Sequence, residues 1–143
     1  MTVCRNIIMR ILIVDDELVS RKKLEAILSS FGETLAVEDG AEALRAFKLA
    51  WEEFRPFDLV CLDINMPMLS GKEVLVRIRA LEEEMMLGRL ARVKIVMTTA
   101  QSDPKSVTEA MKAGCDDYVI KPYNPGKIKM KISQLFADPW DVA

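Results

Sequence analysis

The 143-residue chain contains no histidine. Any chemistry that needs an imidazole, such as proton transfer, zinc ligation or a phosphohistidine, must therefore come from a partner molecule. The three cysteines, Cys4, Cys61 and Cys115, are odd in number and widely spaced. This spacing predicts reduced thiols that pack as small residues, and it argues against a disulfide framework or a zinc site.

Long apolar runs are also absent, since none approaches the roughly 20 residues that cross a bilayer. The formal net charge is only −2, which argues against direct binding of nucleic acid or of a membrane surface by the body of the protein. The length suits one domain, and with reduced thiols we expect a cytoplasmic location. We expect a short preface at 1–8, one domain at 9–137 and a tail at 138–143.

Short β-branched apolar runs alternate with amphipathic stretches along the domain. The runs are typical of fully buried parallel strands, and the stretches between them repeat apolar residues at helical spacing. This alternation predicts an α/β fold with three layers, in which helices cover both faces of a doubly wound, five-stranded parallel sheet. The expected strands are 9–14, 34–37, 58–62, 93–97 and 118–120.

Local signals predict where several helices begin and end. Gly32 is expected to cap the helix that runs to about residue 31, and Gly114 the helix that ends near residue 113. The acidic run 82–84 is expected to be the solvated face of the helix 71–86. Proline in the first turn marks the start of the last two helices.

Reactive side chains follow four of the predicted strands, at ends that share one edge of a parallel sheet. Such an edge is where doubly wound sheets bind their ligands. Three carboxylates close together repel one another, and Mg²⁺ relieves that repulsion with oxygen ligands. A nearby hydroxyl and ammonium suit a bound phosphoryl group. The side chains are those of Asp15, Asp16, Asp63, Thr99 and Lys121.

The chain has no serine–histidine or cysteine–histidine pair and no glycine-rich phosphate loop, so we expect a carboxylate to accept the phosphoryl group. Asp63 is the predicted nucleophile. Taken alone, the pair Asp15 and Asp16 is also typical of a solvated turn.

At this point the chain resembles the receiver domains of two-component response regulators, over nearly everything from 9 to 135. The similar motifs are MRILIVDDE at 9–17, LDINMPMLSG at 62–71, TTA at 98–100 and YVIKP at 118–122. The resemblance implies the CheY-like strand order 2-1-3-4-5, for which this family is itself a standard example among doubly wound folds. The connection 82–92 looks longer than in minimal receivers.

The resemblance also implies a Mg²⁺ site. Asp16 and Asp63 would bind the ion directly, the main-chain carbonyl of Asn65 would complete the protein ligands, and Asp15 would act mainly through a water. Asp63 would be phosphorylated by a partner phosphohistidine.

Further roles follow from the same resemblance. Thr99 and Lys121 would contact the phosphoryl oxygens, and the Lys121–Pro122 peptide bond would be cis. Thr99 and Tyr118 would then switch a protein-binding face between 104 and 131, although Tyr118 can also be an ordinary strand aromatic. The face is expected to expose Lys105, Thr108, Glu109, Lys112, Asp117, Lys127 and Lys131.

The expected partners are a sensor histidine kinase or a histidine phosphotransfer protein, a downstream target protein, and a second copy of the chain through the 104–131 face. No enzymatic activity is expected beyond the protein's own phosphorylation and dephosphorylation.

Two alternatives stay open: a receiver fragment of a larger response regulator or hybrid kinase, and a non-phosphorylated scaffold of the same fold. A flavodoxin is disfavoured because Asp15 and Asp16 would repel FMN phosphate, and a haloacid-dehalogenase-type phosphatase because Asn65 stands where it needs a second Asp.

Overall fold

The computed structural model describes residues 9–100 and 104–137. Within them, strands and helices alternate as expected. The strands are β1 (Met9–Val14), β2 (Gly32–Val37), β3 (Leu59–Asp63), β4 (Lys94–Thr99) and β5 (Asp117–Ile120). The helices are α1 (Leu18–Leu28), α2 (Gly40–Glu52), α3 (Gly71–Glu84), α4 (Pro104–Ala113) and α5 (Pro125–Leu135), with a 3₁₀ turn η1 at Arg89–Ala91. The predicted preface 1–8, the tail 138–143 and the helix start at 102–103 lie outside the described residues.

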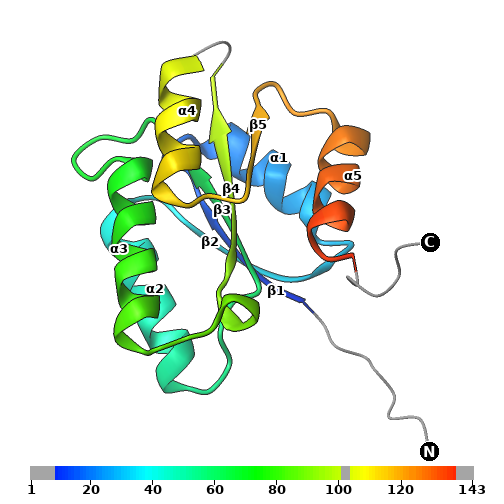
Figure 1. The fold of residues 1–143 in the computed structure, drawn as a ribbon. Helices are drawn as coiled ribbons and strands as arrows, with labels where there is room; N and C mark the ends of the chain where they lie inside the picture. The colour runs from blue at the N-terminus through cyan, green and yellow to red at the C-terminus, as the bar shows by residue number, and fades with distance from the viewer. Residues whose placement is uncertain (1–8, 101–103, 138–143) are drawn as a thin grey trace, which may run out of the picture.

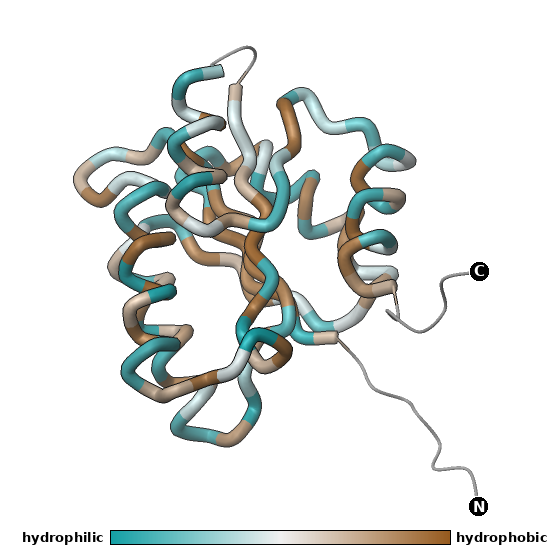
Figure 2. The backbone as a smooth tube through the Cα atoms, in the orientation of Figure 1, coloured by the Kyte–Doolittle hydropathy of each residue, from teal (hydrophilic) through white to brown (hydrophobic). Residues whose placement is uncertain are grey.

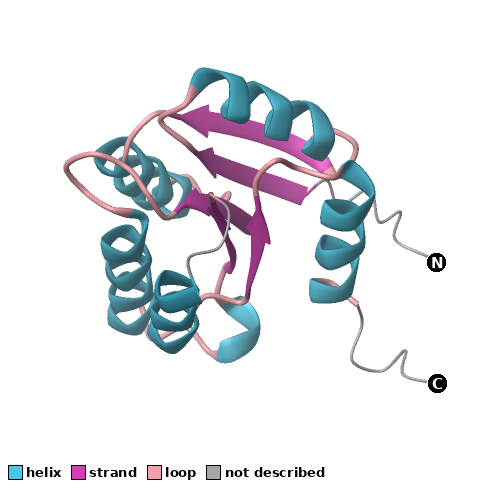
Figure 3. Ribbon diagram, turned by 90° about the horizontal axis from the view of Figure 1, so that it is seen from above, coloured by secondary structure: helices cyan, strands magenta, loops and turns pink. Residues whose placement is uncertain are grey.

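The five strands form one parallel sheet in the order β2-β1-β3-β4-β5. This order confirms the doubly wound fold. Helices α1 and α5 cover one face, and α2, α3 and α4 cover the other (Figures 1 and 3). The carboxyl ends of all strands therefore meet along one edge, at the top of Figure 1.

Each face of the sheet packs its own apolar core. Residues of β3 alternate between them: Val60 and Leu62 pack under α2, α3 and α4, and Leu59 and Cys61 pack under α1 and α5. Figure 2 shows the hydrophobic segments concentrated along the strands at the centre. Burial raises the thiol pKa of Cys61 to about 12, which agrees with its predicted role as a small packing residue.

The prediction that Gly32 caps α1 is wrong. The helix ends at Leu28 with Ser29 as its C-cap, and Gly32 instead opens β2 opposite Met9. A Cβ atom at this position would lie 2.0 Å from the carbonyl oxygen of Met9. The glycine is needed for this close approach of two backbones.

The prediction of a solvated acidic face at 82–84 is wrong for Glu82, whose relative exposure is 0%. Its carboxylate accepts hydrogen bonds from the Val93 amide at 2.7 Å and from Arg79 at 2.6 Å. Glu83 and Glu84 are exposed as expected. The buried carboxylate thus fixes the α3–β4 connection to α3.

Other end signals are confirmed. Gly114 follows α4 with a φ of +111°, and Asn124 caps α5 with Pro125 at its first position. The Lys121–Pro122 peptide bond is cis. Among the described residues, no helix is both long and apolar enough to cross a membrane.

Candidate functional site

Three carboxylates meet at the carboxyl edge of the sheet. Asp15 and Asp16 follow β1, Asp63 ends β3, and each of the three offers an oxygen within 4.8 Å of the others. Asp15 and Asp63 are buried and Asp16 is exposed. The sequence prediction that these residues converge is confirmed in its geometry.

Lys121, directly after β5, points its ammonium into this cluster. Its Nζ lies 3.2 Å from Asp63 Oδ2, to which it donates a hydrogen bond, and 3.1 Å from Asp15 Oδ2. The second contact is an ion pair, and it is the contact that Asp15 Oδ2 makes with a cation among the residues that the structure describes. One ammonium therefore neutralises only part of the charge of three carboxylates.

Backbone groups hold the two buried carboxylates in place. The Glu17 amide donates to Asp15 Oδ1 at 2.9 Å, and the Asn65 amide donates to Asp63 Oδ1 at 3.1 Å. Arg21, a buried cation one turn into α1, donates to the Asp15 carbonyl at 2.9 Å. Arg21 was not predicted from the sequence, because a single arginine in a helix gives no signal of which way it points.

Burial raises the pKa of Asp63 from 3.8 to about 6. Lys121 and the backbone amide of Asn65 lower the pKa of Asp63 and so act against this shift, while the neighbouring Asp15 raises it further. Burial by itself would lower the pKa of Lys121, but Asp63 and Asp15 raise it overall. The site thus keeps its lysine charged and makes the ionised form of Asp63 costly without a further positive charge.

The cluster suits a hard divalent cation. Every candidate ligand is a carboxylate or carbonyl oxygen, the type that Mg²⁺ prefers. Among the described residues, the buried Asp15 Oδ2 has an ion pair with Lys121 but no partner in hydrogen-bond geometry. Asp15, Asp16 and Asp63 could hold such an ion, and Asn65, whose backbone amide donates to Asp63 Oδ1, lies beside them.

Thr99 and Tyr118 lie on one face of the sheet. Tyr118 pairs with Met97, two residues before Thr99, so both side chains project toward the α2, α3 and α4 side. Thr99 is fully buried, and its hydroxyl donates to the Ala100 carbonyl at 3.0 Å. Tyr118 is partly buried, with the Lys131 ammonium 4.7 Å from its ring centroid.

The predicted 104–131 face is less open than expected. Lys105, Thr108, Lys112 and Lys127 are exposed. Glu109, Asp117 and Lys131 are only partly exposed because they form ion pairs: Lys72 contacts Glu109 at 2.8 Å, and Lys131 contacts Asp117 at 3.2 Å.

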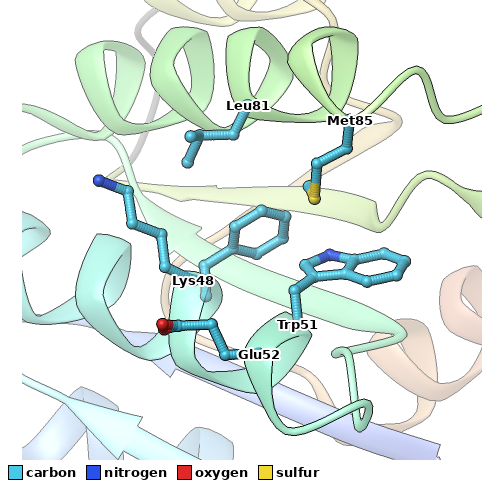
Figure 4. Close-up of a pocket in the computed structure, with 6 residues that line it drawn as sticks. Lys48, Trp51, Glu52, Leu81 and Met85 are labelled. Atoms are coloured by element: carbon cyan, nitrogen blue, oxygen red, sulfur yellow. The ribbon is translucent and has the colours of Figure 1, made fainter.

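An apolar hollow between α2 and α3 has no part in this cluster. Figure 4 shows Trp51, Leu81 and Met85 pointing into it, with Lys48 and Glu52 at its rim. Its volume is about 280 Å³, and neither rim charge belongs to the strand-end cluster.

The model of the response regulator receiver domain matches residues 11–133. This chain belongs to that family. Receiver domains are signalling modules of two-component systems rather than classical enzymes.

Two curated relatives differ in how much of their length the chain spans. Chemotaxis protein CheY-3 of Vibrio cholerae is 34% identical over 130 residues, which cover 90% of this chain and 92% of that protein. The probable transcriptional regulator ycf27 of Cyanophora paradoxa is 35% identical over 127 residues, but the match covers only 47% of its length. The chain thus spans about half of the second relative.

Solved structures confirm the CheY-like fold. Vibrio cholerae CheY4 has a TM-score of 0.76 at 25% identity, covering 90% of this chain and 99% of that one. The receiver domain of Ssk1 from Saccharomyces cerevisiae, crystallised with the histidine phosphotransfer protein Ypd1, has a TM-score of 0.74 at 28% identity. That match covers 88% of this chain and 87% of the matched chain.

Proposed function

We propose that this receiver domain accepts a phosphoryl group on Asp63 from a phosphohistidine of a sensor histidine kinase or histidine phosphotransfer protein. The observation that carries the proposal is the buried Asp63 carboxylate, bonded to Lys121 and grouped with Asp15 and Asp16 at the edge of the sheet. The chain supplies no histidine of its own. The relative crystallised with a histidine phosphotransfer protein supports this class of partner.

In the proposed transfer, an Asp63 oxygen attacks the phosphorus of the partner's phosphohistidine. The new bond joins that oxygen to phosphorus, while the phosphorus–nitrogen bond breaks and its electron pair returns to the imidazole. The Asn65 amide and Lys121 orient the carboxylate through hydrogen bonds to its two oxygens. The Lys121 ammonium and the Thr99 hydroxyl can both donate hydrogen bonds to the phosphoryl oxygens.

Asp15, Asp16 and Asp63, with the carbonyl of Asn65, would hold Mg²⁺ in this proposal. When bound, the ion neutralises charge on the phosphoryl oxygens. Within the chain, Lys121 and the backbone amide of Asn65 favour the ionised form of the acceptor carboxylate, because both lower its pKa. The only activity we propose for the chain is its own phosphorylation and dephosphorylation.

The output is proposed to be a binding event on the 104–131 face, reached through Thr99 and Tyr118. A phosphoryl oxygen can draw the Thr99 hydroxyl away from the Ala100 carbonyl, because a charge-assisted hydrogen bond is the stronger one. Space beside β4 then opens on the face of the sheet that Tyr118 shares. The face would bind a downstream target protein or a second copy of the chain.

Acetyl phosphate with Mg²⁺ tests the acceptor, because it phosphorylates without a partner protein. Mass spectrometry should find one added phosphoryl group that hydroxylamine removes, and Asp63→Asn should abolish it. Asp58→Asn, at the opposite end of β3, is the matched control and should label fully. Equal labelling of Asp63→Asn would disprove the assignment, and no labelling of the parent protein would favour a non-phosphorylated scaffold.

A further inference from the structure

A second hollow, which unlike the first is polar, has a volume of about 350 Å³ and lies at the opposite edge of the sheet from Asp63. The end of α3, the connection to β4 and the turn between α4 and β5 enclose it; we call it the α3–β4 cleft. It reaches Lys94 at the start of β4, roughly 16 Å along the strand from the carboxyl edge. Its charged lining residues are Arg79, Glu83, Arg89, Arg92, Lys94 and Asp116.

Two of these charged side chains, Arg79 and Asp116, already have partners within the protein. Arg79 donates to Asp116 at 3.0 Å, to Glu82 at 2.6 Å and to two backbone carbonyls. Asp116 also accepts from the Ile95 amide at 2.8 Å. Arg79 and Asp116 therefore form the wall of the cleft and have little capacity left for a ligand.

The remaining three cations have no carboxylate partner within the described ranges 9–100 and 104–137. Among the residues that the structure describes, none of the ion pairs within 4.0 Å involves Arg89, Arg92 or Lys94. Arg92 Nε donates a hydrogen bond to the Leu87 carbonyl at 3.2 Å. Like charges gathered around one concave surface repel one another, and an anion bound among them relieves that repulsion.

The backbone that carries these cations is anchored. The buried Glu82 accepts from the Val93 amide, directly between Arg92 and Lys94. The η1 turn closes with a hydrogen bond from the Ala91 amide to the Gly88 carbonyl at 3.0 Å. Because these contacts exist before a ligand arrives, little ordering of the backbone remains for binding.

The chemistry of the lining indicates one class of ligand. Guanidinium groups donate pairs of hydrogen bonds to phosphate oxygens, and an ammonium adds a point charge. Glu83, exposed at the rim, can accept a hydrogen bond from a hydroxyl. The volume lies at the lower end of the range for small-molecule sites, which is roughly 300–1,000 Å³.

We propose that the α3–β4 cleft is a binding site for a small phosphorylated molecule, held by Arg89, Arg92 and Lys94. This site is separate from Asp63 and does not depend on phosphorylation there. Three of its lining residues, Arg89, Arg92 and Val93, belong to the connection between α3 and β4.

Inorganic pyrophosphate is a suitable probe, titrated into the full chain in buffer free of divalent cations. Amide NMR shifts should saturate and should centre on 88–94 and 113–116. Replacing all three cations, Arg89→Gln/Arg92→Gln/Lys94→Gln, should weaken binding at least about tenfold, since each removes a charged hydrogen bond. Glu83→Gln should tighten binding about two- to fivefold, because it removes a like charge from the rim.

The matched control is Arg45→Gln/Lys48→Gln/Arg77→Gln, which removes the same charge from exposed positions on α2 and α3. It should leave the affinity unchanged. Arg89→Gln/Lys94→Gln, which keeps the Arg92 contact to the Leu87 carbonyl, guards against a loss caused by unfolding and should also weaken binding. Equal weakening by the control, shifts that do not saturate, or shifts centred on Asp63 and Lys121 would overturn the proposal.

Discussion

Asp63 shows how one residue combines burial with reactivity. Its relative exposure is 4%, and the loss of solvent raises its pKa more than Lys121 lowers it. An ionised carboxylate at this position is therefore held by the fold at the expense of stability. In the proposed function, a bound cation or a phosphoryl group would reduce this cost, and the site would respond to both.

Asp63→Asn should stabilise the metal-free protein above about pH 6 and leave its stability nearly unchanged near pH 4. The folded-state pKa of about 6 exceeds the ordinary 3.8. The neutral carboxyl of Asp63 therefore contributes its full share to the free energy of unfolding below the ordinary pKa of 3.8. This contribution is lost as the pH rises through the folded-state pKa of about 6. Asn stays neutral, so we expect a gain of about 1–2 kcal/mol at the higher pH. Thermal melts between about pH 4 and pH 8 measure it; a gain that does not vary with pH would contradict the cause.

Asp16→Ala should remove the stabilisation that Mg²⁺ gives. A cation that binds only the folded cluster raises the free energy of unfolding by RT ln(1 + [Mg²⁺]/Kd). Asp16 is the exposed member of the cluster, so its loss removes a ligand without opening a buried cavity. The metal-free variant should melt at the same temperature as the parent or higher. Glu52→Ala, an equal charge change far from the cluster, should keep the full response to Mg²⁺.

At this scale the sequence predicts some residues well and others not at all. Asp15, Asp63 and Lys121 were predicted because strand ends of a parallel sheet meet, whatever the details of packing. Glu82 was misjudged because its burial depends on Val93 and Arg79, and the run 82–84 gives no sign of which carboxylate turns inward. A tertiary contact of this kind leaves no periodic signal.

Among the elements, α3 and its connection to β4 are joined by a buried carboxylate, that of Glu82. Glu82→Ala should lower the free energy of unfolding by about 3–5 kcal/mol, because it leaves Arg79 without its buried partner and the Val93 amide without an acceptor. Glu84→Ala, an exposed position on the same helix, should change it by less than about 0.5 kcal/mol. Urea unfolding of both variants gives the comparison. Equal effects would show that Glu82 contributes no more than a surface residue.

Two helices end in a conformation that normally requires glycine. Phe54 follows α2 with a φ of 59°, and Met86 follows α3 with a φ of 56°. In each case the backbone amide of the next residue donates a hydrogen bond to a carbonyl of the last helical turn. The Arg55 amide donates to the Ala50 carbonyl, and the Leu87 amide donates to the Glu82 carbonyl. This is the Schellman arrangement, in which an L side chain is unfavourable.

Phe54→Gly and Met86→Gly should therefore each stabilise the protein, by about 0.5–1 kcal/mol. Both side chains are 89% exposed, so little packing is lost. Met86→Ala separates the causes, because it removes the side chain and keeps the unfavourable backbone angle; it should give no gain. Chemical denaturation of the variants decides between them. A loss of stability in the glycine variants would show that these exposed side chains contribute to the fold.

For the whole molecule, alternation of strands and helices was enough to predict the layers but not the order of the strands. Periodicity shows that a segment is buried and does not show which neighbour it pairs with, so the order came from the family resemblance. The resulting fold places the acidic cluster at one edge and the α3–β4 cleft at the other. Strand β5 joins the two regions, since Asp116 precedes it at the cleft and Lys121 follows it at the cluster.

Lys131, on α5, contacts Asp117 and Tyr118 of β5, and the ring of Tyr118 is the group that turns in the proposed switch. Its ammonium donates to the Tyr118 carbonyl at 2.8 Å, contacts Asp117 at 3.2 Å and lies 4.7 Å from the Tyr118 ring centroid. An inward turn of that ring would give up the cation–π contact, which is typically worth about 0.5–1 kcal/mol at exposed sites. In the proposed switch, this contact would therefore favour the unphosphorylated arrangement.

Lys131→Gln should shift the equilibrium about two- to fivefold toward the phosphorylated arrangement, as the loss of about 0.5–1 kcal/mol implies. The parent protein with beryllofluoride, an acyl-phosphate mimic, gives the reference NMR spectrum. Without beryllofluoride, the amide chemical shifts of 104–131 in the variant should already lie part of the way toward that reference. Lys127→Gln, an exposed position on the same helix, should leave the spectrum of the unphosphorylated protein in place. Beryllofluoride shifts confined to the loops after β1, β3 and β4, with 104–131 silent, would show that the signal leaves through another face.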